Sequence, residues 1–205
     1  SCSVMYHSSK KALKESDYDP NKQLNKNYFA SANTKLYIEK LCQFYSDIGD
    51  TKYTVIRHSN IFGPYDKFDL ERSHFFGATI TKTLTSEKNI TIWGDGEEGR
   101  DLLYVSDLMN FVYKSLTLQT KKFRIYNCGS GKIYKIKEIA NKIIEKTKND
   151  KKIIFDLSKP TIKTNVFLDI NLAKKELKWK PEISLEKGIK KTISWYKKNV
   201  KIDKL

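Results

Sequence analysis

Four consecutive polar side chains follow a short apolar run in the first third of the chain. The run, residues 53–56 (YTVI), is rich in β-favouring residues and too short to show a helical period, so we expect a strand. Residues 57–60 (RHSN) come directly after it, and Gly63-Pro64 then signals a turn. Ligands of open α/β sheets bind beyond the carboxyl ends of the strands, so these four side chains could meet a ligand. The alternative is a strand that runs into an ordinary polar turn.

Other elements must position this strand end. Apolar residues recur at three- and four-residue steps over residues 30–47, which predicts an amphipathic helix just before the strand. Residues 90–93 are expected to form a second short strand that meets the turn Gly94-Asp95-Gly96. Arg100-Asp101 opens a further strand, and Asp107 is placed like the N-cap of a helix.

The composition limits the class of protein. With 205 residues and 39% hydrophobic residues, the chain can bury the core of one domain, or of one domain and a small lobe. No run reaches the roughly 18 apolar residues of a membrane span, and no signal peptide is visible, although the chain begins with Ser1. The cysteines are scattered without metal-ligand spacing, so we expect a reducing cytoplasm and no metal site.

The formal net charge of +15 allows two interpretations. A basic face could bind nucleic acid or an acidic membrane. However, the lysines are spread along the chain, and no zinc finger, RNA-binding aromatic pattern or arginine-rich tract accompanies them. We therefore favour lysines that solvate helix faces over a nucleic-acid-binding role. The positive potential would also attract an anionic diphosphate ligand.

The segment RHSNIFGP, residues 57–64, resembles the R-x-x-N-[VIL]-[YF]-G-P motif of a known family. The family is the NAD-dependent epimerase/dehydratase family of extended short-chain dehydrogenases/reductases, whose members act on nucleotide sugars. Residues 89–108 resemble its G-x-x-x-R-[DE]-[FLY]-[IL]-x-V-x-D segment, and residues 66–82 carry the D-x-F and S-H pattern of its GDP-fucose-synthase-like branch. The matches follow the family's order over nearly the whole chain, so together they are more specific than any one motif.

The resemblance implies an α/β fold, made of the C-terminal part of a Rossmann-type parallel sheet and a small α/β substrate-binding lobe. Residues 1–64 would form a partial Rossmann core that holds the late strands and the catalytic-lysine helix. Residues 65–205 would form mainly the substrate-binding lobe, with residues 89–131 returning partly to the Rossmann sheet. The family's G-x-x-G-x-x-G loop has no counterpart here, so we expect a fragment that lacks the dinucleotide-binding half.

The family's helix carries Tyr-x-x-x-Lys, in which the lysine holds the nicotinamide ribose and the tyrosine is the acid and base. Lys35 matches this lysine, and Glu39 follows it as in the family, but Ser31 stands in the tyrosine position. A serine hydroxyl cannot replace a phenol as a general acid. Tyr28 lies about 10 Å before Lys35 along a helix axis. Three possibilities stay open: a local bulge or unwinding recruits Tyr28, another residue supplies the proton, or the activity is lost.

The resemblance assigns two further catalytic positions. The hydroxyl that holds the reacting sugar oxygen stands four residues before a tyrosine, which is the position of Cys2 here, and Ser1 or Ser3 could fill it after a small shift. A thiol is a weaker donor than a hydroxyl. Cys2 could instead match the functional cysteine of the GDP-fucose-synthase-like branch, or be a small buried residue. His74 stands where that branch has a catalytic acid for epimerisation, and its alternative role is to cap the next helix.

The resemblance also assigns ligand-binding residues. Asn60 would contact the substrate diphosphate or the nicotinamide end of the cofactor. Arg100 would grip the nucleotide diphosphate, because the planar guanidinium can bond two phosphate oxygens at once. Ser73 and Trp93 are assigned to the substrate.

The function implied is an NAD(P)-dependent nucleotide-sugar epimerase, dehydratase or reductase, with NAD or NADP as cofactor and a nucleotide-diphosphate sugar as substrate. The departures at Ser31 and Cys2 support an alternative, a catalytically inactive protein that binds nucleotide sugars on the same scaffold. We expect a homodimer when the protein is full length, formed through the helix that carries Lys35, and we expect no membrane partner and no nucleic acid.

Overall fold

The computed structural model describes residues 1–200, which divide into two compact units. The first unit consists of Ser1–Ile61, Arg100–Ile133 and Thr164–Glu182, and the second consists of Phe62–Gly99, Tyr134–Lys163 and the described residues from Ile183 onward. The α-helices are α1 (Phe29–Ile48), α2 (Phe75–Thr85), α3 (Val105–Leu118), α4 (Ile136–Thr147), α5 (Asn171–Leu177) and α6 (Leu185–Asn199). The strands are β1 (Tyr53–His58), β2 (Asn60–Phe62), β3 (Asn89–Trp93), β4 (Gly99–Arg100), β5 (Leu102–Tyr104), β6 (Phe123–Cys128), β7 (Tyr134–Lys135), β8 (Lys152–Asp156) and β9 (Asn165–Val166). Three short 3₁₀ helices precede α1: η1 (Ser3–Met5), η2 (Glu15–Asp17) and η3 (Lys26–Tyr28).

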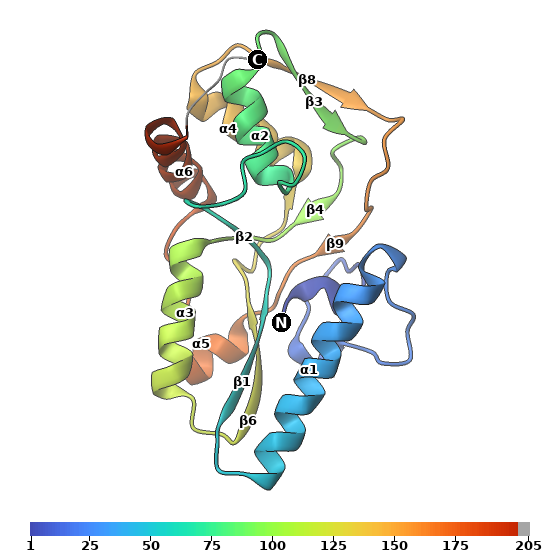
Figure 1. Cartoon of the computed structure of the whole chain (residues 1–205), viewed down its shortest axis with the longest axis vertical. Coiled ribbons are helices and arrows are strands. Elements are labelled where there is room, and N and C mark those ends of the chain that lie inside the picture. The colour runs from blue at the N-terminus through green and yellow to red at the C-terminus, as the bar shows by residue number, and fades with distance from the viewer. Residues whose placement is uncertain (201–205) are drawn as a thin grey trace. The chain divides into compact units, whose positions relative to one another are not determined.

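The first unit is built on a parallel strand pair. β1 and β6 pair in register from Tyr53↔Phe123 to His58↔Cys128, and β2 pairs with β5. Parallel strands need a long crossover connection, so residues far apart in the sequence form this pair. In Figure 1, α1 lies on one side of the β1–β6 pair, and α3 and α5 lie on the other. The predicted α/β fold with parallel strands is confirmed, as are the helix before β1 and β1 itself.

Apolar side chains between β6, α3 and α5 form the core of the first unit. Trp179 and Phe111 are fully buried, and their rings pack edge to face with centroids 4.8 Å apart. The Trp179 ring N–H donates to the backbone oxygen of Asp107 at 3.1 Å. The expectation that Asp107 is an N-cap is wrong, because Tyr104 is the N-cap and Asp107 lies in the first turn of α3. The Asp107 carboxylate accepts instead from the backbone N–H of Glu182, at 3.1 Å.

The second unit repeats the parallel arrangement on a smaller scale. β3 and β8 pair in register from Asn89↔Lys152 to Trp93↔Asp156, so the predicted strand at residues 90–93 is confirmed. α2 contacts both β3 and α4, and α6 contacts α4. The turn after β3 needs glycine, because Gly96 has φ +70° and a Cβ there would meet the Phe155 ring at 2.7 Å.

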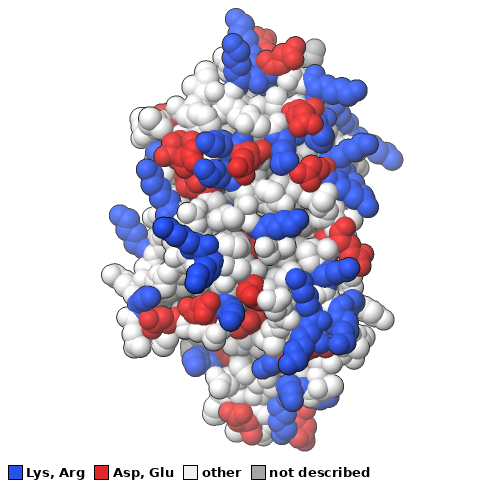
Figure 2. All heavy atoms as spheres, turned by 180° about the vertical axis from the view of Figure 1, so that it is seen from behind, with Lys and Arg blue, Asp and Glu red and all other residues white. Residues whose placement is uncertain are grey.

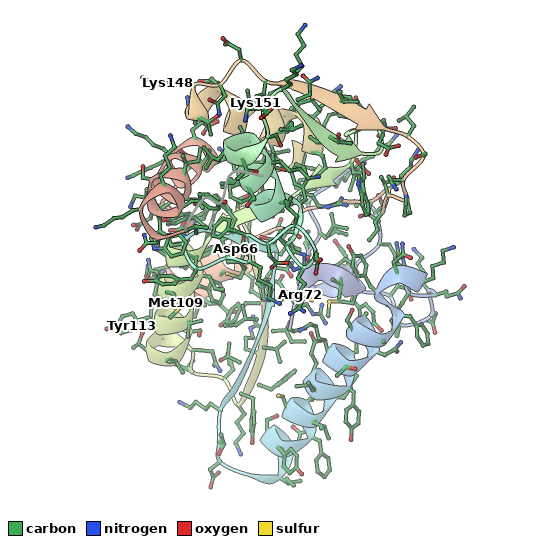
Figure 3. All side chains as sticks on the ribbon, turned by 45° about the horizontal axis from the view of Figure 1, so that its top comes forward. Asp66, Arg72, Met109, Tyr113, Lys148 and Lys151 are labelled. Carbon is green, nitrogen blue, oxygen red and sulfur yellow. The ribbon has the colours of Figure 1, made fainter. Side chains whose placement is uncertain are left out.

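Two helices of the first unit expose apolar side chains. On α1 the exposed fractions reach 64% for Tyr37 and 65% for Ile48. On α3 they are 60% for Met109 and 67% for Tyr113, which Figure 3 labels on the outer side of that helix. Single exposed apolar residues are ordinary, but two helices with several each have surfaces suited to contact with other protein.

Charged side chains of both signs cover much of the surface. Figure 2 shows lysines and arginines interspersed with acidic side chains on the face that it presents, without one continuous basic stripe. Within residues 1–200, no helix is both long enough and apolar enough to cross a membrane.

Candidate active site

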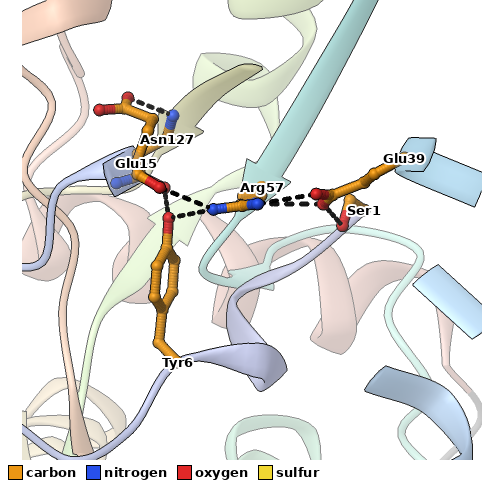
Figure 4. A network of polar contacts seen from close by, with 6 residues as sticks. All are labelled: Ser1, Tyr6, Glu15, Glu39, Arg57 and Asn127. Atoms are coloured by element: carbon orange, nitrogen blue, oxygen red, sulfur yellow. Dashed lines mark hydrogen bonds and ion pairs between the residues drawn. The ribbon is translucent and has the colours of Figure 1, made fainter. Parts of the chain in front are cut away.

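A buried ion pair fixes α1 against β1. The guanidinium of Arg57 forms a fork with the Glu39 carboxylate, with Nη2–Oε2 at 2.7 Å and Nε–Oε1 at 3.1 Å (Figure 4). Both side chains are almost fully buried, with exposed fractions of 4% and 6%. Burial acts to lower the pKa of Arg57, but the hydrogen bonds from Arg57 to Glu39 and the Glu39 charge outweigh it, so the guanidinium stays charged. This fork determines where the turn of α1 that carries Lys35 lies relative to the strand end.

The Arg57 side chain continues into a wider buried network. Its Nη1 donates to the Tyr6 hydroxyl at 2.9 Å and to the Glu15 backbone oxygen at 3.0 Å, and Tyr6 donates onward to Asn127 Oδ1 at 2.8 Å (Figure 4). Burial raises the pKa of Tyr6 to about 12, so its phenol remains protonated. Each of the three nitrogens of the Arg57 guanidinium thus has a partner inside the first unit, so Arg57 is placed to hold the fold together.

The four polar residues at the end of β1 therefore differ in role. Arg57 and Ser59 are 3% exposed, whereas His58 is half-buried and Asn60 is exposed. We expected that all four side chains could meet a ligand, but the burial of Arg57 and Ser59 leaves only His58 and Asn60 accessible to one. The Asn60 side-chain amide donates to the Asp101 backbone oxygen at 3.1 Å, which leaves its carbonyl oxygen at the surface of the strand end.

Lys35 lies one helical turn before Glu39 on α1 and is half-buried. Its ammonium has no hydrogen-bond or ion-pair partner among residues 1–200. Burial lowers the pKa of His58, and the positive charge of Lys35 adds to this lowering, so the two side chains lie within electrostatic range of each other. Lys35 thus lies within electrostatic range of the last side chain of β1, and its role in holding a cofactor stays a prediction.

Neither hydroxyl near the start of α1 is hydrogen-bonded to the Lys35 ammonium. The Ser31 hydroxyl donates to the Tyr28 backbone oxygen at 3.1 Å. Tyr28 is the N-cap residue of α1, and its half-buried side chain packs against the core of the first unit. α1 is helical without interruption from Phe29, so Tyr28 and Lys35 remain two turns apart.

The first residues of the chain lie beside β1. Cys2 is 9% exposed and forms a parallel bridge with His58, so the expected strand end at residues 1–6 is reduced to a single bridge. Ser3 opens the short helix η1, and its backbone oxygen accepts from the Tyr6 N–H at 3.1 Å. Cys2 is therefore a direct neighbour of His58 at the strand end, and Ser3 is one step removed from it.

Arg100 lies next to Asp101, at the same stretch of backbone that Asn60 contacts. Its Nη1 donates to the Thr164 backbone oxygen at 2.8 Å, and the side chain remains partly exposed.

Asp101 is fully buried, and its carboxylate accepts from the Ser130 N–H and hydroxyl, both at 2.7 Å, and from the Leu168 N–H at 3.1 Å. Asn60 and Arg100 are thus held by one rigid segment around Asp101. The sequence analysis did not predict this role, because Asp101 stood out only as one position of the family motif.

Three of the predicted site residues belong to the second unit. His74 is exposed and precedes α2 as its N-cap residue, but its side chain makes no capping hydrogen bond. The Ser73 hydroxyl is buried and has no partner among the described residues. Trp93 is 54% exposed, and the Lys159 ammonium lies 5.9 Å from its ring centroid. Burial raises the pKa of Asp66, which Figure 3 labels, and the nearby His74 opposes this shift.

In the part of the chain that the structure describes, no group of three or more histidine, cysteine or acidic side chains is close enough to hold a metal ion.

Comparisons with known proteins show which family this chain resembles. The model of the NAD dependent epimerase/dehydratase family matches residues 1–129. The chain is 33% identical over 171 residues to a GDP-L-colitose synthase from Yersinia pseudotuberculosis, covering 80% of this chain and 55% of that protein. It is also 33% identical over 177 residues to a UDP-glucuronate 4-epimerase from Thermodesulfobacterium geofontis, covering 84% of this chain and 52% of that protein.

The fold is likewise that of solved structures. A crystal structure of a GDP-6-OMe-4-keto-L-xylo-heptose reductase from C. jejuni superposes with a TM-score of 0.86 at 21% identity, over 96% of this chain and 68% of that one. The chain spans about half the length of the curated relatives it matches, 55% and 52% of the two named above. The motifs, the parallel sheet, the placement of Lys35 and these matches lead to one conclusion: the chain belongs to the NAD-dependent epimerase/dehydratase family of extended short-chain dehydrogenases/reductases.

Proposed function

We propose that the chain supplies catalytic and substrate-binding residues of an NAD(P)-dependent nucleotide-sugar epimerase, dehydratase or reductase. One observation carries the proposal: the Lys35 ammonium is half-buried at the carboxyl end of β1 and has no partner among residues 1–200. A half-buried lysine without a protein partner can offer its positive charge and its hydrogen-bond donors to a ligand. The Glu39–Arg57 fork that fixes this turn of α1 is itself buried, so the site is preorganised.

The described residues fit one end of the cofactor. Lys35 would hold the hydroxyls of the nicotinamide ribose, and Asn60 offers an exposed amide at the same strand end. At two of the glycines the space for a cofactor diphosphate is filled: a Cβ at Gly129 would lie 2.5 Å from Asp101 Oδ2, and one at Gly96 would meet Phe155. The cofactor, when bound, supplies hydride chemistry at a sugar carbon.

Residues of the first unit would hold the nucleotide diphosphate. Arg100 would bond two oxygens of the nucleotide diphosphate, and Asn60 would donate to the diphosphate or to the nicotinamide end. In the second unit, the unpartnered hydroxyl of Ser73 and the exposed ring of Trp93 suit polar and stacking contacts with a sugar nucleotide. His74, exposed at the start of α2, would act as an acid if the reaction includes epimerisation.

The test is nucleotide-sugar binding to the protein as encoded, measured by calorimetry with GDP- and UDP-sugars. We expect Arg100→Gln to weaken binding about tenfold or more, because a charge-assisted hydrogen bond contributes about 1.5–3 kcal/mol. The matched control is Arg124→Gln. Arg124 lies on β6 and is paired with Glu176, so its removal should leave the affinity for the nucleotide sugar unchanged. No binding of any nucleotide sugar, or equal weakening by both variants, would contradict the proposal.

The second candidate is a nucleotide-sugar-binding protein without turnover, and Ser31 favours it. The Ser31 hydroxyl is directed to a backbone oxygen and has none of the acidity of a phenol. This candidate predicts sugar-nucleotide binding, but no change in nicotinamide absorbance when substrate and cofactor are mixed with the protein. Measurable turnover would exclude it.

We further propose that the protein forms a homodimer through the exposed apolar face of α1. Tyr37 and Ile48 are 64% and 65% exposed on that helix. Replacing both with glutamate (Y37E/I48E) should convert a dimer to a monomer in light scattering, since buried charges disfavour the contact. Met109→Glu, on the exposed face of α3, is the control and should leave the dimer intact. A monomeric wild-type protein would refute the proposal.

A further inference from the structure

The proposed reaction needs a group that moves a proton at the sugar oxygen, and Ser31 cannot do so. We propose that His58 is this acid–base residue and that its Nε2 exchanges the proton with the reacting sugar hydroxyl. The inference rests on the proposed function and adds to it a residue that the motif does not assign.

His58 lies where a ligand of this sheet would be expected to bind. It is the last residue of β1, and open α/β sheets bind ligands just beyond the carboxyl ends of their strands. It is half-buried, and the parallel bridge with Cys2 puts these two side chains on the same face of neighbouring backbone segments. Of the four polar residues at this strand end, only His58 combines access with a side chain that titrates near neutral pH.

The hydrogen bond of the imidazole determines which nitrogen is reactive. His58 Nδ1 lies 2.7 Å from the Ser59 backbone oxygen. A carbonyl oxygen can only accept, so Nδ1 must carry a proton and donate it. In the neutral ring Nε2 then holds the lone pair, and no described residue is bonded to it. Nε2 is therefore available to take a proton from a bound hydroxyl group and to return it.

The surroundings keep the ring neutral until it accepts a proton. Burial lowers the pKa of His58 from its ordinary value of 6.5, and the positive charge of Lys35 adds to this, while the bond to Ser59 opposes it. Cys128 pairs with His58 in the β1–β6 register, and burial raises the pKa of its thiol, so it carries no charge at neutral pH. A neutral imidazole is the form that can act as a base towards a hydroxyl group.

The proton and electron movements balance. If the sugar carbon is oxidised, its hydroxyl proton would move to His58 Nε2, and the bound oxidised cofactor would supply the acceptor for the hydride that leaves the carbon. The sugar carbon becomes a ketone and the imidazole becomes an imidazolium. In the return step, the imidazolium gives the proton back to the oxygen as hydride returns to the carbon. Lys35 favours that return, because its positive charge destabilises the imidazolium.

The experiment compares variants of the protein as encoded. His58→Asn keeps an N–H that can donate to the Ser59 oxygen but removes Nε2. We expect kcat to fall about 100-fold or more, since a general acid–base group contributes about 10²–10⁴ in rate, while the affinity for the nucleotide sugar stays within about twofold of wild type. The matched control is Ser31→Ala, which should leave kcat unchanged.

A rescue separates proton transfer from a structural role. Ser31→Tyr places a phenol one turn before Lys35 and on the same face of α1. In the His58→Asn background it should restore kcat at least tenfold if the missing function is proton transfer. No restoration, or wild-type kcat in His58→Asn alone, would overturn the inference.

A second readout does not depend on activity. Nitrogen NMR of the labelled protein without ligand should show the tautomer with a proton on Nδ1 and a His58 pKa below 6.5. The opposite tautomer would overturn the inference. Wild-type protein that binds a nucleotide sugar without turnover also overturns it, whereas failure to bind any nucleotide sugar refutes the proposed function itself.

Discussion

Replacing Arg57 with methionine is expected to lower the free energy of unfolding by about 3–5 kcal/mol. The variant leaves the Glu39 carboxylate, 6% exposed, without its cation in the interior of the first unit. It also removes the donor to the Tyr6 hydroxyl and to the Glu15 backbone oxygen. Urea denaturation followed by circular dichroism measures the effect, and the expected loss is a large part of the stability of an ordinary domain.

The matched control is Arg124→Met. Arg124 also forms an arginine fork with a glutamate, Glu176, but the two side chains are 33% and 26% exposed. Water screens such a pair, so its loss is expected to lower the free energy of unfolding by about 1 kcal/mol or less. Equal losses in the two variants would mean that the burial of the Arg57 fork has no energetic consequence.

The double variant R57M/E39L tests the reason for the effect. With both charges removed and apolar groups in their place, no uncompensated carboxylate remains in the interior. Replacement of buried ion pairs by apolar residues is often neutral or stabilising, so the double variant should be more stable than Arg57→Met alone. A double variant as unstable as Arg57→Met would assign the loss to packing or to the Tyr6 contact instead.

The role of Arg57 also marks a limit of what the sequence could predict. Patterns that depend on neighbouring residues were predicted closely: the helix expected at residues 30–47 is Phe29–Ile48, and the strand expected at residues 90–93 is Asn89–Trp93. The partner of Arg57 lies on another element, 18 residues away, and the hydroxyl that it contacts lies 51 residues away. Local pattern therefore placed Arg57 at a strand end but could not show that it faces inward.

Asp107 illustrates the same limit. An acidic residue ahead of a helical pattern is typical of an N-cap, yet the helix begins two residues earlier, at Val105. The contacts of Asp107 lie with Trp179 and Glu182, 72 and 75 residues further along the chain. Only tertiary packing could reveal them.

The sequence could assign candidate site residues where the Tyr-x-x-x-Lys motif is intact, but not where this chain departs from the motif. Lys35 was predicted from its spacing to Glu39, and the structure places both on the predicted helix, but the role of Lys35 stays a prediction. The proton-moving group was left open, because Ser31 breaks the motif and no spacing rule relates residue 31 to His58. The parallel bridge between Cys2 and His58 joins segments more than 50 residues apart, and it is this bridge that brings His58 into consideration.

Replacing Asp101 with asparagine is expected to lower the free energy of unfolding by about 2–4 kcal/mol. The carboxylate is fully buried, and its Oδ2 accepts from the Leu168 N–H at 3.1 Å while its Oδ1 accepts from Ser130. An asparagine that keeps the Ser130 contacts turns its NH₂ group towards the Leu168 N–H. Two donors then face each other in the interior, and each unsatisfied buried group costs about 1–3 kcal/mol. Denaturation in urea measures the loss.

The chain contains a close counterpart of this contact at the surface. Asp156 Oδ1 accepts from the Ser158 N–H at 3.1 Å and from its hydroxyl at 2.6 Å, just as Asp101 Oδ1 accepts from the N–H and hydroxyl of Ser130. Because Asp156 is open to water, Asp156→Asn should leave the stability nearly unchanged. If the two variants were equally destabilised, the loss at Asp101 could not be attributed to burial.

The pH dependence gives an independent check on Asp101. Burial raises the pKa of its carboxyl above the ordinary 3.8, despite the hydrogen bonds from Ser130 and Leu168 that favour the charged form. The folded state therefore binds this proton more tightly than the unfolded state. The stability that results is complete below about pH 4 and is lost as the pH rises through the raised pKa. Asparagine does not titrate, so the difference in unfolding free energy between wild type and Asp101→Asn should be larger in acid than at neutral pH. A difference that grows towards neutral pH would show instead that the hydrogen bonds outweigh desolvation and that Asp101 is buried as a stabilised anion.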